Sequence, residues 1–141
     1  MRQARIVISL VPLVLCAFAI LLLEFGDNVV TSRYATYGDA VASNLFERGW
    51  LPDIIPASAR TIVTSNNVDF NTSTGAFRFD PGDTAAFVSQ LRPFDRWGIA
   101  PADYAARVKA MESAGYRAHE YRDGASFWVF FVNDEESRVF Y

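Results

Sequence analysis

The feature that most constrains this chain is a run of eighteen uncharged residues, 6–23, of which thirteen are Leu, Ile, Val or Phe. As a helix rising about 1.5 Å per residue, the run is roughly 27 Å long, close to the hydrocarbon thickness of a bilayer, about 30 Å. The alternative is a buried core helix. A helix that is apolar on every side, however, needs more protein around it than a chain of 141 residues offers. We therefore expect residues 1–25 to form an N-terminal transmembrane anchor.

Three fates are open to such a segment: retention, cleavage or lipidation. The apolar run exceeds the roughly 7–15 residues of a signal peptide, and Ala40-Val41-Ala42, which resembles a cleavage site, lies too far downstream. Lipidation would fall on Cys16, but the large Leu15 precedes it and the apolar run continues beyond it. The residues favour a retained anchor.

Charges on either side of the run predict its orientation. Arg2 and Arg5 precede it, whereas Glu24 and Asp27 follow it. Positive flanking residues stay on the cytoplasmic side, so the carboxy-terminal part is expected outside the cytoplasm. Twelve arginines against one lysine indicate a GC-rich bacterial genome. The prediction is a single-pass protein of the bacterial inner membrane, with a cytoplasmic amino terminus and a periplasmic domain.

The composition of the exported part argues against several function classes. From Glu24 onward there are eleven basic and sixteen acidic residues, and this excess of negative charge disfavours nucleic acid as a partner. The only cysteine, Cys16, lies in the anchor. An intrachain disulfide, a thiol nucleophile and a cysteine metal site are therefore excluded outside the membrane.

The start of the exported part reads as a linker, 26–35, followed by a helix over 36–48. Thr36 and Asp39 have the spacing of a capping box, and Gly49 suits the left-handed position just past a helix. The apolar stripe of this helix is expected to comprise Tyr37, Val41 and Leu45.

Residues 36–141 are expected to form one α+β domain. Its predicted strands start at Arg60, at Ala76, at Tyr116, at Ala125 and at Ser137, and its further helices begin after Asp80 and at Pro101. The Asp123-Gly124 pair predicts a hairpin turn, and neighbouring strands close in sequence favour antiparallel pairing. We predict a mostly antiparallel sheet of about five strands with two or three helices.

Between the first helix and the first strand lies a compact stretch that begins Trp50-Leu51-Pro52 and includes Pro56. The two prolines push the residues before them toward extended geometry, so a semi-rigid extended connector is expected. Trp50, Ile54 and Ile55 can belong to the core or line a groove for a ligand or partner.

The same stretch carries a resemblance to small, uncharacterised, membrane-anchored or exported bacterial proteins. The residues that carry it are Gly49, Trp50, Leu51, Pro52, Pro56, Ser58, Ala59 and Ile62, followed by Asp69, Asn71 and Phe79. The resemblance covers about a third of the chain and implies location and a single small domain, but no activity. At 69–71, Asp-Phe-Asn replaces a more polar triplet, which argues against a finely tuned site in this loop.

The residues needed for common catalytic and metal chemistry are sparse. His119 is the only histidine and falls in a predicted strand, and no serine lies in a Gly-x-Ser-x-Gly elbow. A calcium loop starting at Asp69 fails because Thr74 stands where glycine is needed. Paired carboxylates remain open, since any two acids can meet in the fold. The expectation is a non-enzymatic protein without a metal or cofactor.

Most of the twenty-one aromatic residues in 141 are needed to fill the core, and the remainder are available for an interface. Tryptophan and tyrosine dominate binding energy at interfaces, so Trp50, Trp97 and Tyr141 are the candidate partner-binding residues. The function expected first is a protein-interaction or accessory module, such as an assembly factor, an accessory subunit or an immunity protein. The alternatives are a small-ligand or cell-wall binding module and, last, an unrecognised hydrolase.

Overall fold

A computed structural model describes residues 28–94, 102–124 and 126–141. Its strands are β1 (Val29–Thr36), β2 (Arg60–Asn67), β3 (Thr72–Arg78), β4 (Arg92–Pro93), β5 (Arg117–Asp123), β6 (Ser126–Asn133) and β7 (Arg138–Phe140). Its helices are α2 (Tyr37–Ala42), the 3₁₀ turn η1 (Pro81–Asp83), α3 (Thr84–Val88) and α4 (Ala102–Ser113). The expected anchor lies outside these residues, and within them no helix has the length and apolarity to cross a membrane.

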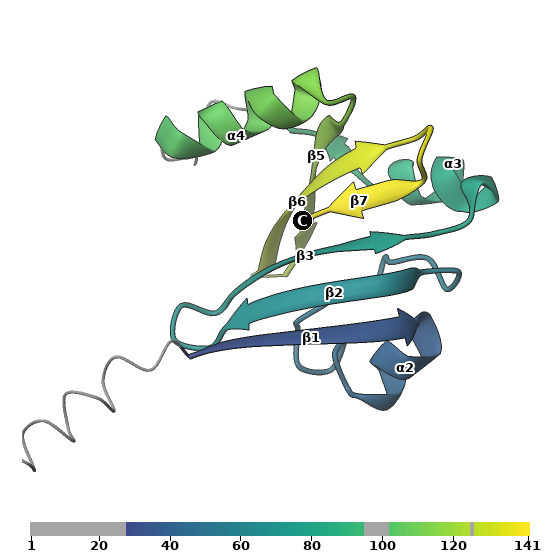
Figure 1. The fold of residues 1–141 in the computed structure, drawn as a ribbon, viewed down its shortest axis with the longest axis vertical. Helices are drawn as coiled ribbons and strands as arrows, with labels where there is room; N and C mark the ends of the chain where they lie inside the picture. Colours follow the sequence, from purple (N-terminus) through teal and green to yellow (C-terminus); the bar gives the residue numbers. More distant parts are fainter. Residues whose placement is uncertain (1–27, 95–101, 125) are drawn as a thin grey trace, which may run out of the picture.

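The strands form one sheet in the order β1-β2-β3-β7-β6-β5-β4, and every neighbouring pair is antiparallel (Figure 1). The α+β class is confirmed, but the sheet has seven strands rather than about five. One added strand is β1, which the sequence assigns largely to the linker 26–35. Most of its side chains are exposed, so it carries no buried alternation that would reveal it, and its pairing with β2 defines it.

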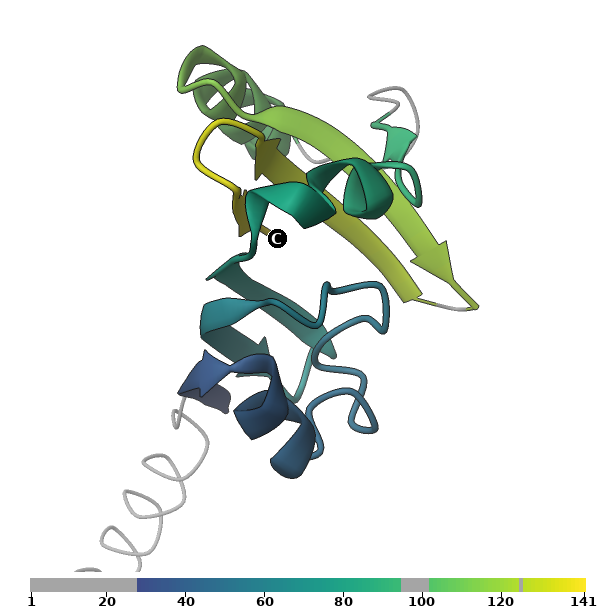
Figure 2. The same ribbon diagram turned by 90° about the vertical axis from the view of Figure 1, so that its right-hand side faces the viewer.

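Helices cover the two faces of the sheet unequally (Figure 2). On one face, α2, the segment after it and α3 pack onto a core that includes Phe77, Phe87 and Phe130. On the other face, α4 packs through Val108 against Phe131. Around Phe87 the aromatic rings contact one another edge-on or tilted, with centroids 5.5–5.9 Å apart, and Trp128 stacks on Phe130 at 6.5 Å.

Helix α2 is shorter than the expected 36–48. Its capping box between Thr36 and Asp39 is present as predicted. It ends at Ala42, because Asn44 adopts a left-handed conformation with φ of 57°. The expected apolar stripe is therefore broken, and Val41 is 47% exposed. Gly49 does adopt the predicted positive φ, 68°.

The connector, defined here as residues 50–59, consists of turns rather than the extended chain expected from its prolines. The amide of Ile55 donates to the carbonyl of Pro52 and that of Ala59 to the carbonyl of Pro56, at 3.3 and 2.9 Å. Ile55 is buried in the main core and Trp50 is half-buried. The connector thus both fills the core and presents part of its surface.

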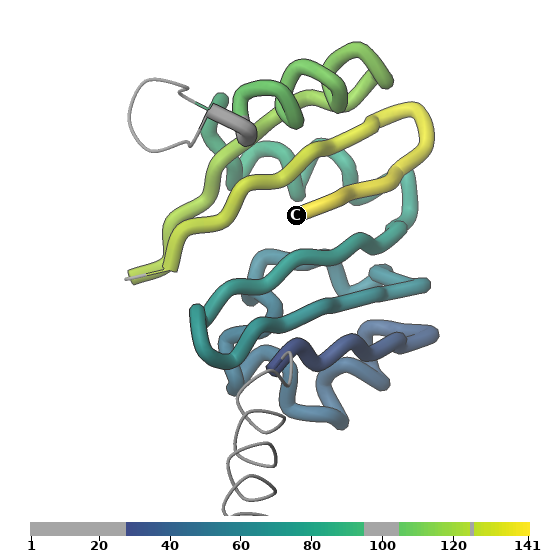
Figure 3. Tube along the Cα trace, turned by 60° about the vertical axis from the view of Figure 1, so that its left-hand side comes forward, coloured from purple at the N-terminus to yellow at the C-terminus, as the bar shows by residue number. Residues whose placement is uncertain are grey.

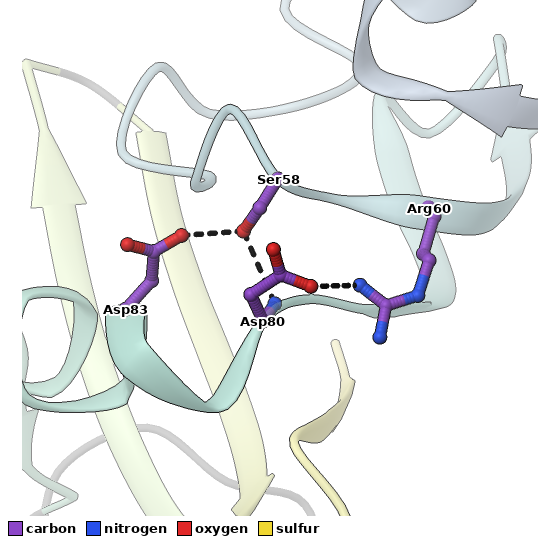
Figure 4. A network of polar contacts seen from close by, with 4 residues as sticks. All are labelled: Ser58, Arg60, Asp80 and Asp83. Atoms are coloured by element: carbon purple, nitrogen blue, oxygen red, sulfur yellow. Dashed lines mark hydrogen bonds and ion pairs between the residues drawn. The ribbon is translucent and has the colours of Figure 1, made fainter.

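A polar network fastens the end of the connector to the turn before α3 (Figure 4). Ser58 Oγ donates to Asp83 Oδ2 at 2.5 Å and accepts from the Asp80 amide at 3.1 Å. The Asp80 carboxylate, in turn, forms an ion pair of 2.6 Å with Arg60. Asp80 therefore holds the turn through its backbone and Arg60, instead of capping the helix with its side chain as expected.

A close approach between β3 and the end of β7 requires a glycine. Gly75 and Tyr141 exchange two backbone hydrogen bonds of 3.0 Å. A Cβ at Gly75 would overlap the carbonyl oxygen of Val63 and lie 2.5 Å from the Tyr141 hydroxyl. The ring of Tyr141 therefore lies directly over Gly75.

Replacing this glycine is expected to destabilise the fold. Gly75→Ala should lower the free energy of unfolding by about 3 kcal/mol, because its methyl group meets backbone on one side and a buried ring on the other. Gly82→Ala is the matched control, since a Cβ there meets nothing within 4 Å, and should change stability by less than about 0.5 kcal/mol. Urea unfolding compares the two, and equal stabilities would contradict the close packing.

The Ser58 network gives a second stability prediction. Ser58→Ala should lower the free energy of unfolding by about 1–2 kcal/mol, because it leaves the Asp80 amide and the Asp83 carboxylate without this partner. Ser89→Ala removes an exposed hydroxyl that bonds only to its own helix and should have little effect. A loss at Ser58 no larger than at Ser89 would show that the network does not stabilise the domain.

Candidate functional site

The candidate site is a hollow of about 350 Å³ where the two halves of the sheet diverge; we call it the sheet cleft. Its walls come from three segments distant in sequence: the connector, the β2–β3 hairpin and the start of β6. Among the residues that line it are Trp50, Asn66, Thr72, Ser73, Phe127 and Trp128. No charged residue of the described part of the chain lines it.

The deep wall of the sheet cleft is a buried polar network. Asn66 is 2% exposed, and its Nδ2 donates to Thr64 Oγ1 at 2.9 Å. Ser73 Oγ lies 2.5 Å from Asn66 Oδ1 and 3.1 Å from the Trp50 carbonyl oxygen, so its proton can serve either acceptor. Polar side chains inside a sheet are costly unless paired, and here their pairing fixes the connector against β3.

The outer walls of the cleft are aromatic. Trp128 is nearly buried and packs edge-on against Tyr141, with ring centroids 5.8 Å apart. Its neighbour Phe127 is 37% exposed. The half-buried Trp50 ring lies against the Arg48 guanidinium, 5.1 Å from the ring centroid. The cleft therefore combines flat apolar rings with amide and hydroxyl groups.

The side chains that line the cleft in the described residues are apolar or polar without a titratable group. Burial raises the pKa of the Tyr141 phenol to about 12, and the hydroxyls of Thr64 and Ser73 offset only part of that effect. Tyr141 is thus protonated at neutral pH. The amides of asparagine do not titrate, and the hydroxyls of Thr72 and Ser73 have no histidine or carboxylate beside them among the residues that line the cleft.

The three predicted binding residues have different places in the structure. Trp50 lines the cleft. Tyr141 is buried behind it and contacts the cleft through Trp128. Trp97 lies outside the described residues. The binding role assigned to each remains a prediction.

His119 lies in β5, in a strand as expected, and faces Phe130 across the pair. Burial, and then the charge of Arg117, lower the pKa of its imidazole. Its Nε2 atom is buried and has no hydrogen-bond partner among the described residues. The surroundings of this ring therefore disfavour its protonated form.

In the described ranges, no three His, Cys, Asp or Glu side chains lie close enough together to hold a metal ion. Near Ser58, the Asp83 carboxylate accepts from the Ser58 hydroxyl, whereas the Asp80 carboxylate pairs with Arg60 (Figure 4). These contacts join the end of the connector to the turn before α3.

A second surface feature is an apolar tip where the β2–β3 turn meets the first described residue. Phe70 is 77% and Val68 59% exposed, and Val29 and Val30 are also exposed beside them. Asn28 holds this turn: its carbonyl accepts from the Val68 amide, and its Nδ2 donates to Asp69 at 2.8 Å. Because Asn28 bonds to this turn, the tip lies at the end of the described domain where β1 begins.

Sequence reasoning found Trp50 but missed the rest of the cleft. Asn66, Ser73 and Trp128 come from three strands, and only their register brings them together. One signal was available: the alternation of Thr64 and Asn66 with Ile62 on one strand face puts polar residues where a core is expected.

Comparison with known families covers part of this site. Residues 28–78 match the family model of the YbbD head domain, and no curated protein and no solved structure matches the chain. The matched stretch comprises β1, α2, the connector, β2 and β3, and so includes the connector and hairpin walls of the cleft but not the β6 wall. The family is uncharacterised and brings no activity with it. Over a little more than a third of its length, this chain is similar to the YbbD head domain.

Proposed function

We propose that this chain is a non-enzymatic, membrane-anchored module whose extracytoplasmic domain binds another protein through the sheet cleft. The observation that carries the proposal is the lining of the cleft, which combines aromatic rings from the connector and β6 with amides from the β2–β3 hairpin and has no charge among its described residues. Half-buried tryptophan beside satisfied polar groups is typical of the centre of a protein interface.

The apolar tip supports the membrane part of the proposal. If residues 6–23 cross the bilayer, only five residues separate the last of them from Val29. Val68 and Phe70 then lie close to the bilayer surface, where exposed apolar side chains cost less than in water. The tip thus gives the domain a second contact with the membrane beside its anchor.

A cell-wall or small-ligand module is the second candidate, and the same lining favours it. Indole rings such as Trp50 offer flat apolar faces, and Asn67, Asn71 and Thr72 offer hydrogen-bonding groups for neutral polar ligands such as glycans. The two candidates differ in the size and type of partner, so one set of experiments can separate them.

Photo-crosslinking tests the protein-binding function. A photoreactive amino acid at Asn71, exposed at the cleft, should give one discrete protein adduct in intact cells. The same group at Lys109, exposed on α4 over the opposite face, should give none. Trp50→Ala should abolish the Asn71 adduct. The melting temperature of the Trp50→Ala protein is measured alongside, to exclude loss of the adduct through unfolding.

A different outcome would favour the second candidate. Absence of an adduct at Asn71, together with a rise in melting temperature when soluble peptidoglycan fragments are added, would replace the protein partner with a glycan. Absence of both would reject binding at the cleft.

The membrane contact of the tip has its own test. In full-length protein reconstituted into vesicles, brominated lipids should quench the added fluorescence of Phe70→Trp but not that of Val41→Trp. Val41 is the control because it is also exposed but lies on α2, which follows the far end of β1. Equal quenching of both, or of neither, would contradict a tip held at the bilayer surface.

A further inference from the structure

Strand β7 fills only part of the space between its neighbours. It pairs with 76–78 of β3 and with 131–133 of β6, and Tyr141 adds one more pair with Gly75. Beyond that point β3 continues to Thr72 and β6 extends back to Ser126, with no described strand between them. Figure 3 shows Tyr141, marked C, at the mouth of the two diverging hairpins.

Hydrogen bonds at the filled end show which backbone groups face this opening on β3. The amides of Gly75 and Phe79 donate to Tyr141 and Ser137, so the odd-numbered residues of β3 direct their backbone groups toward β7. Directions alternate along an antiparallel strand. Ser73 therefore turns its N–H and C=O into the opening.

The same reasoning applies to β6. The Phe94 amide donates to the carbonyl of Ala118, so the even-numbered residues of β5 face β4 and the odd-numbered ones face β6. His119 pairs with Phe130 in β6, so the even-numbered residues of β6 face β5. Phe127 and Val129 consequently direct their backbone groups away from β5, into the opening.

Three residues on two facing strands thus present backbone donors and acceptors that no described strand takes up. Such groups are costly when shielded from water and form a template for another strand when they are not. The sheet cleft lies at this place, since Ser73, Phe127 and their neighbours line it. It is bounded by a strand on each side, unlike the open outer edge of β1.

We propose that a short extended segment of the protein partner binds as an additional strand between β3 and β6, in line with β7. This inference rests on the proposed protein-binding function and specifies its mode. Strand addition gives affinity through main-chain hydrogen bonds and selectivity through alternate side chains. Two flanking strands offer the segment bonds on both of its edges.

The register indicates which segment fits. If the bound segment continues the register of β7 past Tyr141, its first and third residues bond to Val129 and Phe127. The side chains of these two residues then lie on the same face of the sheet as Val129 and Phe127. The second bonds to Ser73, and its side chain turns toward Trp50 and Asn66. The favoured segment is uncharged, apolar at its first and third positions, small and polar at its second, and free of proline.

A tail attached to the full-length protein tests the slot directly. Val-Ser-Val-Ser added after Tyr141 should fill it at high effective concentration and slow amide exchange at Phe127 and Val129 by about tenfold or more. Pro-Ser-Pro-Ser is the matched control: it has the same length but lacks the two N–H groups that bond to β6. It should leave exchange at both residues unchanged.

The tail also links the slot to the partner. Val-Ser-Val-Ser should abolish the Asn71 adduct in cells, whereas Pro-Ser-Pro-Ser should not. Equal exchange with both tails, or protection only at the outward-facing Thr31 and Arg33 amides of the β1 edge, would overturn strand addition. If the Asn71 adduct then persisted, the protein-binding function would stand and only its mode would be wrong.

Discussion

Three residue pairs between β3 and β7, with a fourth between Gly75 and Tyr141, hold the two halves of this domain in one sheet. One of them, Phe77 with Val139, is buried, and the Phe77 ring also contacts Phe87 of α3 at 5.9 Å. In the main core, the connector covers the half formed by β1, β2 and β3, and α3 packs on the other half through Phe87 and Phe130. Helix α4 covers that other half on the opposite face. Because so few pairs join them, the halves diverge as soon as β7 ends, and the sheet cleft lies at that divergence. The connection that makes the fold continuous also sets the size and place of the candidate site.

Elements that depend on residues close together in the sequence could be predicted. Elements that depend on pairing between strands far apart in the sequence could not. The capping box at Thr36, the left-handed Gly49 and the turn at Gly124 follow from local chemistry, and the structure contains all three. The sequence alone predicts a linker where the edge strand β1 lies, because the exposed side chains of this strand follow no buried alternation. The predicted helix 36–48 is longer than α2, because a local pattern favours a helix that tertiary packing does not continue. The spacing of Val41 and Leu45 suits a helix, but burial of Leu45 through turns of the following chain outweighs helical propensity.

The cleft was harder to predict than the fold, because it depends on register between strands distant in sequence. Trp50 stood out as a large apolar residue between a helix and a strand, yet nothing local pairs it with Ser73, whose hydroxyl its carbonyl can accept. Gly75 gave a partial signal, since glycine inside a strand marks a close approach of other chain segments. The segment that approaches it is the residue at position 141, which no pattern near Gly75 identifies.

The two surface features are parts of one hairpin, and this constrains how any partner reaches the cleft. Val68 and its neighbours in the β2–β3 turn line the cleft on one side and the apolar tip at Asn28 on the other. If the tip rests on the bilayer, the opening between β3 and β6 cannot lie far above it, since only the hairpin turn separates them. A partner segment then has to approach along the membrane surface. A chain that is itself tethered to the same bilayer satisfies this geometry at lower entropic cost than a freely diffusing protein, because tethering raises its effective concentration near the cleft. An uncharged segment suits that place as well, because the cleft offers no described charge to pair with it.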